Sequence, residues 1–346
     1  MTAHSLAPEH KPKMEAPSIK QLASRHAPLL LTIALIIAGY FAVGSAQTWL
    51  TLTVAGLAMG MMIFIMASGV TIVFGLMDII NFGHGAFISI GAFVGASTLA
   101  AMGGFAGADN IGLNLIAMGA AILTAIVATA LIGWLFERLI VAPVYGNHLS
   151  QILTTMGGLI ITEQLIHVFW GPDQIFMPKP EALKGAIVVF GAAIEKYRIF
   201  AVGVGLVLFA AMMWVMAKTR LGLIVRAGVE NPEMVESLGY RIKRLFIYVF
   251  MAGSALAGLG GVMWGSYQEI VTASIGFQSM ILVFIVVIIG GLGSVGGCFM
   301  GALMVGLLNN YTAFAAPKLA LVSNIALMVC ILMWRPQGMY PVVKAK

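Results

Sequence analysis

The chain has 346 residues, of which 60% are hydrophobic and only 9% are charged, and its formal net charge is +6. Ordinary soluble proteins carry about 25% charged residues, so this composition cannot cover a water-facing surface. The mean hydropathy of +1.00 is spread along nearly the whole chain, which excludes a soluble domain with a single membrane anchor. The basic residues form no helical face with interleaved aromatics, which argues against a nucleic-acid-binding surface.

Ten long apolar runs predict membrane-spanning segments. They cover residues 28–46, 51–74, 86–102, 112–136, 150–170, 197–217, 245–264, 277–290, 297–314 and 319–334. Because lipid offers no partner for free backbone groups, such segments must be helices or a closed barrel, and these runs lack the alternation of barrel strands. We therefore expect an all-α polytopic membrane protein with about ten membrane segments.

The distribution of basic residues predicts that both termini are cytoplasmic. Counting ten passes from a cytoplasmic amino terminus places 14 of the 19 Lys and Arg residues inside. This asymmetry is the one that the positive-inside rule expects. The five basic residues expected outside are Lys179, Lys184, Lys196, Arg198 and Lys318.

We expect three parts along the chain: a basic cytoplasmic leader at 1–27, a transmembrane domain at 28–334 that includes a cytoplasmic loop at 218–245, and a cytoplasmic tail at 335–346. The first apolar run also resembles the core of a signal peptide, so cleavage near Ala46 is the alternative. The leader is long for a signal peptide, which favours a retained first span.

The sequence contains no motif for covalent chemistry. Lys218-Thr219 follows Ala217 rather than a glycine-rich turn, so there is no phosphate loop, and the six histidines are too dispersed for a metal cluster. We expect no catalytic site, metal site or cofactor on this chain. Acidic residues inside the apolar runs are scarce, and Glu163 is the best candidate for a carboxylate in mid-membrane. An ion-coupled carrier would normally need more such groups.

Small residues recur at four-residue spacing in several runs, most clearly at Gly253, Ala257, Gly261 and Gly265. Such stripes allow helix backbones to approach closely in lipid. Packing within one subunit is the favoured interpretation, and an interface between subunits is the alternative.

The longest polar interruption on the predicted cytoplasmic side, 218–245, carries the signals of a short helix. Asn231 can cap the helix, Pro232 suits its first position and Gly239 suits its C′ position. A helix of about two turns is marginal in water by itself, so we expect a partner or neighbouring segments to hold it. A capped surface helix without a partner is the alternative. The candidate helix comprises Asn231, Pro232, Glu233, Met234, Val235, Glu236, Ser237, Leu238 and Gly239.

The stretch from Glu233 to Gly239 is similar to the Glu-Ala-Ala-x-x-x-Gly loop of ABC importer permeases. In those permeases the loop forms a coupling helix that sits in a groove of the ATP-binding subunit. The spacing matches, whereas Met234 and Val235 replace the two alanines. The resemblance implies that this loop couples the chain to a separate ATPase.

Three further stretches resemble the branched-chain amino acid permease family of the LivH type. They are Phe74-Gly75-Leu76 followed by Ile80-Asn81-Phe82-Gly83-His84-Gly85-Ala86-Phe87, the glycine-rich stretch 289–297, and Trp170-Gly171-Pro172-Asp173. Each motif is weak alone, but together and in this order they indicate the family. The resemblance runs from about residue 50 to 340 and leaves the basic leader uncovered.

Two of these stretches are candidates for a role in transport. The first set comprises Asn81, Gly83, His84 and Gly85, and the second Gly290, Gly291, Gly293, Gly296 and Gly297. Around His84 a break in the helix would let polar side chains line the translocation pathway. The alternative is a packed turn whose His84 only satisfies a neighbouring carbonyl. For the glycine set, a tight turn that requires positive φ is the favoured interpretation.

The longest segment on the predicted outer side, 171–198, is stiffened by three prolines and has several basic residues. It could receive the acidic edges of a solute-binding protein. The alternative is a lid packed on the helices.

The family resemblance implies a transmembrane subunit of an ATP-driven importer in the bacterial cytoplasmic (inner) membrane. By that resemblance it pairs with a homologous second permease, two ATP-binding subunits that bind ATP and Mg, and a periplasmic or surface-anchored solute-binding protein. Branched-chain or related hydrophobic amino acids are the expected substrates. Urea, short amides and aromatic acids are the alternatives, and a stand-alone channel or ion-coupled carrier is the alternative of a different class.

Overall fold

The computed structural model describes residues 19–219, 222–224, 227, 237, 239 and 241–340, with side chains from residue 27 onward. In this part of the chain eight helices are long and apolar enough to cross a membrane. They are α2 (Ala46–Met77), α3 (His84–Ala101), α5 (Ile111–Phe136), α6 (His148–Trp170), α7 (Lys196–Lys218), α10 (Ile242–Gln268), α12 (Val295–Ala315) and α13 (Ala320–Trp334). The last reaches the length of a span together with the 3-10 turn that precedes it from Pro317. Two apolar helices are shorter: α11 (Ile275–Gly290) and the part of α1 (Ile19–Val43) that begins at Ala27.

Each of the ten predicted apolar runs corresponds to one of these helices. The prediction of an all-α polytopic membrane protein is therefore confirmed. Helix starts follow local sequence: Asn110 caps α5 by accepting from the amides of Gly112 and Leu113, and Asn147 caps α6 by accepting from the amide of Ser150.

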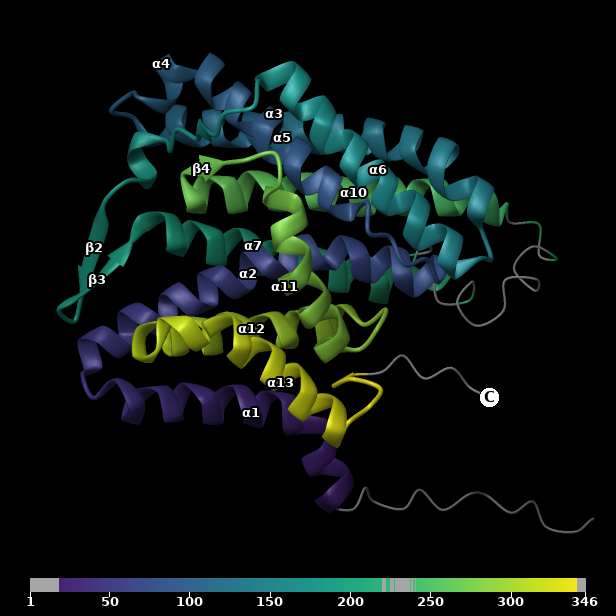
Figure 1. Ribbon diagram of the computed structural model, residues 1–346. Coiled ribbons are helices and arrows are strands. Elements are labelled where there is room, and N and C mark those ends of the chain that lie inside the picture. Colours follow the sequence, from purple (N-terminus) through teal and green to yellow (C-terminus); the bar gives the residue numbers. More distant parts are fainter. Residues whose placement is uncertain are drawn as a thin grey trace, which may run out of the picture.

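Short strands gather at one end of the bundle, which we call the hairpin end. Strand β2 (Ala186–Val189) pairs with β3 (Ala192–Glu195), and β1 (Ile175–Phe176) pairs with β4 (Ile270–Val271), both antiparallel. Figure 1 shows the β2–β3 hairpin, β4 and the short helix α4 (Gly103–Ala106) at this end. The three segments that contain them are among those that the count of ten passes places outside.

The opposite end carries the turns between α5 and α6 and between α11 and α12. After α5 the chain continues as a π-helix, η1 (Glu137–Val141), and a short 3-10 helix, η2 (Ala142–Val144). Two further 3-10 helices, η3 (Glu181–Leu183) and η4 (Pro317–Leu319), lie in the segments that join α6 to α7 and α12 to α13.

The centre of the bundle is α2, which contacts α7, α10, α11 and α12. Of its apolar window, 83% is buried, against 11% for α13 at the periphery. The predicted glycine stripe of α10 lies in this centre. Gly253 packs on Gly69 of α2, and Gly261 packs on the backbone of α3 at Ile88. The stripe thus serves packing within one chain, as favoured from the sequence.

Two helices begin inside the bundle rather than at its ends. His84, the first residue of α3, lies beside Met66, which precedes the end of α2 at Met77 by 11 positions, about 16 Å along the helix. Helix α11 also begins beside α3, where Gly276 meets Gly85. Figure 1 shows the chain turning from β4 back into the bundle before α11 runs across the direction of α2 and α10.

The glycine packing of α10 predicts a measurable difference between two helix glycines. A Cβ at Gly261 would collide with the carbonyl oxygen of Ile88 and lie 2.9 Å from the amide of Ala92, whereas a Cβ at Gly119 of α5 would meet nothing within 4 Å. We expect Gly261→Ala to destabilise the fold by about 1–3 kcal/mol. Gly119→Ala should be neutral or slightly stabilising, because alanine favours helix.

The melting temperature of each detergent-purified variant measures this difference, with size-exclusion chromatography to determine the fraction that remains monodisperse after heating. Equal melting temperatures for Gly261→Ala and Gly119→Ala would show that α3 and α10 can separate without cost, which this packing does not allow.

Candidate functional site

The turn between α2 and α3 is buried inside the chain. Helix α2 ends at Asp78, whose φ of 51° is left-handed, and residues 79–83 lead back to the middle of α2. There His84 Nε2 lies 2.9 Å from the carbonyl oxygen of Met66, and the His84 residue is 1% exposed. This is the carbonyl contact expected for a packed turn.

Asn81 lies in the same turn and is 3% exposed. Its Oδ1 accepts no hydrogen bond from the described residues. The next backbone amide, that of Phe82, donates to Thr155 Oγ1 of α6 at 3.2 Å. A side chain at Gly83 would collide with the ring of Phe136, so glycine is needed for the turn to pack there. The pathway role of Asn81 and His84 remains a prediction, and both side chains lie within this subunit rather than on its surface.

The start of α11 meets this turn from the hairpin end. Ser89 Oγ of α3 donates to the carbonyl of Ala273 at 2.7 Å and accepts from the amide of Gly276 at 3.0 Å. Gly276 and Gly85 lie so close that neither position has room for a side chain. Two irregular segments, 78–83 and 272–274, thus enter the bundle from opposite ends and meet at α3.

Sequence reasoning missed Ser89. A serine in an apolar run carries no signal of its own, and only the fold shows that this hydroxyl satisfies two backbone groups of another helix.

The glycine set between α11 and α12 forms the tight turn expected from the sequence. Gly291 has φ of 95° and Gly293 has φ of 81°. Gly290 and Gly297 lie in backbone contact where α11 and α12 cross, and Ser294 caps α12 by accepting from the amide of Gly297 at 3.1 Å. Gly296 has no atom near the position of its missing side chain, so neither packing nor φ explains that glycine.

Two other segments cover this turn. A Cβ at Gly75, in the predicted Phe74-Gly75-Leu76 motif, would lie 2.8 Å from Cα of Gly293. The amides of Met339 and Tyr340 donate to the carbonyls of Ile289 and Gly290 at 2.9 and 3.1 Å. Two motifs that are far apart in sequence therefore meet at one place, and the first residues of the expected tail are folded against them.

Most of the candidate coupling helix lies outside the described residues: Asn231, Pro232, Glu233, Met234, Val235, Glu236 and Leu238. Ser237 is helical, and Gly239 has φ of 86°. That left-handed backbone is the conformation expected of a glycine that ends a helix. The loop connects α7 to α10 at the end opposite the hairpins.

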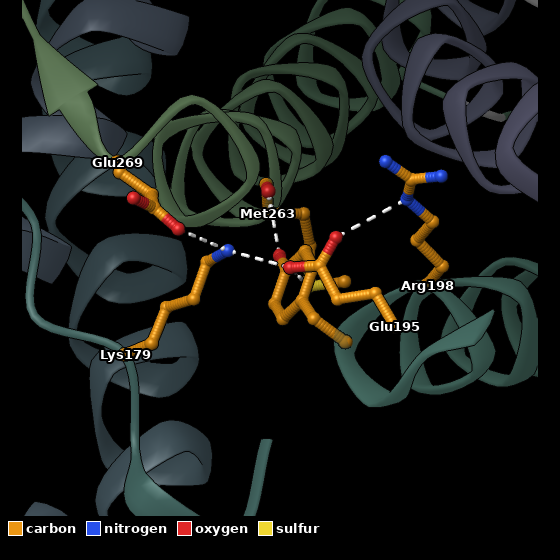
Figure 2. A network of polar contacts seen from close by, with 6 residues as sticks. Lys179, Glu195, Arg198, Met263 and Glu269 are labelled. Carbon is orange, nitrogen blue, oxygen red and sulfur yellow. Dashed lines mark hydrogen bonds and ion pairs between the residues drawn. The ribbon is translucent and has the colours of Figure 1, made fainter. Parts of the chain in front are cut away.

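An ion-pair network joins the long 171–195 segment to the α10–α11 connection at the hairpin end (Figure 2). Lys179 Nζ lies 2.9 Å from Glu195 Oε1 and 2.7 Å from Glu269 Oε1. Arg198 Nε lies 3.2 Å from the other oxygen of Glu195, close enough for charge attraction but poorly aligned for a hydrogen bond. Tyr197 lies under Lys179, with its ring centroid 5.2 Å from Nζ, and its hydroxyl donates to the carbonyl of Met263.

Burial alone would lower the pKa of Lys179, but hydrogen bonds and charge attraction from Glu195 and Glu269 outweigh it and raise that pKa. Lys179 therefore stays charged in the physiological range. Beside it, the amide of Met177 donates to the carbonyl of Glu269 at 2.9 Å, continuing the β1–β4 pairing. The segment is a lid tied to α10, and the charge of Lys179 is already neutralised within the chain. Lys184 is paired as well, with the exposed Glu181.

Within the described ranges, no three His, Cys, Asp or Glu side chains lie close enough to hold a metal ion. The polar groups that the fold brings together instead satisfy backbone breaks inside an apolar bundle.

These features define a polytopic helical membrane protein whose irregular segments meet inside the bundle. The family described as branched-chain amino acid transport system / permease component matches residues 52–332. The chain belongs to that family.

Several curated proteins are similar over most of their length. The high-affinity branched-chain amino acid transport system permease protein BraD of Pseudomonas aeruginosa is 28% identical over 298 residues, covering 82% of this chain and 93% of BraD. The corresponding permease protein LivH of Escherichia coli K12 is 28% identical, covering 82% and 92%. LivM of the same organism is 27% identical, covering 82% of this chain and 69% of LivM.

Among solved structures, a chain described as an inward-facing metal-chelate type ABC transporter matches with a TM-score of 0.48 and 16% identity. The match covers 89% of this chain and 99% of that one. At that similarity it adds nothing to the assignment.

The lid network predicts that breaking two lysine ion pairs at the hairpin end lowers the free energy of unfolding by unequal amounts. Glu195→Gln leaves the 7% exposed Lys179 with one carboxylate partner in place of two, and we expect a loss of about 1–3 kcal/mol. Lys184→Met removes a pair whose side chains are both more than half exposed, and the loss should stay below about 1 kcal/mol. Thermal unfolding and the rate of proteolysis within 171–195 measure both effects.

The double variant Lys179→Met with Glu195→Gln should recover part of the loss, because no buried cation is then left without its partner. Additive losses in the double variant would contradict a direct interaction between the two side chains.

Proposed function

We propose that this chain is a transmembrane permease subunit of an ATP-driven (ABC) importer for branched-chain or related hydrophobic amino acids. The observation that carries the proposal is the family match, which spans residues 52–332 and therefore nearly every described membrane helix. The chain itself performs no covalent chemistry. It moves solute by alternating between packings of its helices that open to one side or the other.

The substrate class is supported by two observations. BraD, LivH and LivM are named as branched-chain amino acid permeases. The described spans also carry few ionisable groups, which suits a zwitterionic solute with an apolar side chain. Urea, short amides and aromatic acids are the alternative substrates within the same class of importer.

The proposed assembly contains a homologous second permease, two ATP-binding subunits and a solute-binding protein, in the bacterial inner membrane. Both LivH and LivM of one organism resemble this chain, which supports pairing between permeases of one fold. ATP and Mg are assigned to the ATP-binding subunits. The hairpin end faces the solute-binding protein, and the opposite end, with both termini, faces the cytoplasm, in keeping with the distribution of basic residues.

The loop around Asn231 to Gly239 is assigned the coupling role. It lies between α7 and α10, and α10 contacts α2, α3 and α5. A force applied to the loop would therefore act on a helix whose glycines contact the backbones of α2 and α3. The turn at Gly290 to Gly297 and the segment at Asn81 to Gly85 would then be the places where α11 and α3 change their packing.

Transport itself gives the first test. Proteoliposomes that contain the complete transporter should accumulate leucine only when ATP is inside and the solute-binding protein is present, and excess isoleucine or valine should compete. The purified chain alone should hydrolyse no ATP above a blank, because it has no phosphate loop. Accumulation of leucine by the chain alone, driven by an ion gradient, would instead establish a carrier.

The coupling role predicts different outcomes at two glycines of similar geometry. Gly239 and Gly146 have φ of 86° and 82°, and neither has an atom within 4 Å of the missing Cβ. Valine at either position should cost roughly 1–3 kcal/mol of backbone strain. Only Gly239→Val should also uncouple, giving ATP hydrolysis that no longer responds to the solute-binding protein and leucine uptake lowered about tenfold or more.

Both variants must be compared at equal abundance in the membrane. If Gly239→Val and Gly146→Val transport equally well, the 231–239 stretch is an ordinary capped loop, and the coupling contact lies elsewhere.

A further inference from the structure

Glu163 occupies an unusual place for a carboxylate. Helix α6 has 23 residues, about 34 Å, and Glu163 precedes its last residue, Trp170, by seven positions, or about 10 Å. Because the hydrocarbon core of a bilayer is about 30 Å thick, this carboxylate lies inside it. The side chain is partly exposed on the chain and makes no hydrogen bond or ion pair with any described residue.

Two further polar side chains lie on the same edge of α6. Gln164 is exposed and has no partner among the described residues, and His167 Nδ1 is buried without one. At about 100° per residue, these three positions fall within an arc of about 100°. Ile161 and Leu165, 60% and 48% exposed, lie on the other side of the uncovered face.

The polar edge runs from mid-depth toward the hairpin end. Toward the opposite end the same arc is apolar, with Ile160 56% and Leu153 63% exposed. The exposed arc of α6 is therefore polar from mid-depth to the hairpin end and apolar toward the opposite end. Lipid against this edge would leave three polar groups without partners.

No cation in the described spans can balance Glu163. Their lysines and arginines, such as Arg138, Lys196 and Lys218, lie at helix ends. A second copy of this chain related by twofold symmetry would bring a second Glu163 to the interface and no lysine or arginine at its depth. A cation that balances Glu163 must therefore come from outside this chain.

We propose that Glu163, Gln164 and His167 line a water-filled vestibule open to the hairpin end, in which Glu163 takes the α-ammonium group of the amino-acid substrate. The site rests on the proposed function, because only an importer of amino acids brings a zwitterion to this place. Glu163 supplies the charge, and the neutral Gln164 amide and His167 ring supply hydrogen bonds to the rest of the polar head.

Charge-selective labelling tests the vestibule without depending on transport. In the assembled transporter with the exposed Cys330 replaced by serine, Gln164→Cys is treated with membrane-impermeant methanethiosulfonates that carry either a trimethylammonium or a sulfonate group. We expect labelling of Gln164→Cys from the hairpin side, at least about threefold faster with the cationic reagent. Adding Glu163→Gln should abolish that preference, and Ile161→Cys should react with neither reagent.

Three results would overturn the proposal. An unreactive Gln164→Cys would place this edge against protein, such as the second permease, or against lipid. Equal rates with both reagents would remove the cation-attracting role of Glu163. Equal reactivity at Ile161→Cys would mean that water reaches all sides of α6.

Leucine uptake by the same transporter provides the second arm. Glu163→Gln should lower the maximal uptake rate about tenfold, and Glu163→Asp should restore most of it, while the amount of assembled complex stays unchanged. Unchanged uptake in Glu163→Gln would remove the substrate contact. If Gln164→Cys labels as expected but the wild-type transporter takes up no amino acid, the charged vestibule is supported and the proposed function is refuted.

Discussion

The rest of this structure depends on one constraint: inside a bilayer, every backbone amide and carbonyl must find its partner within the protein. Segments 78–83 and 272–274 break helices in the middle of the bundle and expose such groups. Some find backbone partners within the turns, and others are satisfied by side chains of α3 and α6: Ser89 bonds to Ala273 and Gly276, and Thr155 to Phe82. A rearrangement of the breaks must therefore exchange these hydroxyl partners rather than lose them.

The sequence predicted the elements well because apolar length and periodicity are set by the same lipid constraint. All ten runs became helices, and two of the five glycines in the 290–297 stretch, Gly291 and Gly293, have positive φ. Depth within the bundle was not predictable. Hydropathy treats α3 and α11 as ordinary spans, whereas contacts between Gly85 and Gly276 show that both begin inside. A single sequence carries no signal for the depth at which a helix starts.

The partners of charged side chains were the other feature that the sequence could not predict. Lys179 reads as one of several basic residues in a loop, but its partners Glu195 and Glu269 lie 16 and 90 positions away in sequence. Only tertiary structure brings them together. For Glu163 the sequence was sufficient to predict the environment, because the apolar residues around it place it in a membrane span. The fold adds that no described side chain forms an ion pair or hydrogen bond with it.

Helix α10 connects the features that the proposed function needs. Its first residue follows the proposed coupling loop, its glycines contact α2 and α3 at the level of the broken segments, and Glu269 at its far end pairs with Lys179 of the lid. Because these contacts are backbone-to-backbone, α10 cannot rotate or slide without moving α3 or parting from it. α10 has 27 residues and is about 40 Å long. A displacement of its first residues, next to the proposed coupling loop, would therefore move the lid as part of one rigid helix, without intermediate side-chain rearrangements. The exposed position of Glu269, whose side chain is 63% exposed, makes its bond to Lys179 the contact along this route that solvent can most readily replace, so the lid end is where the route would part first.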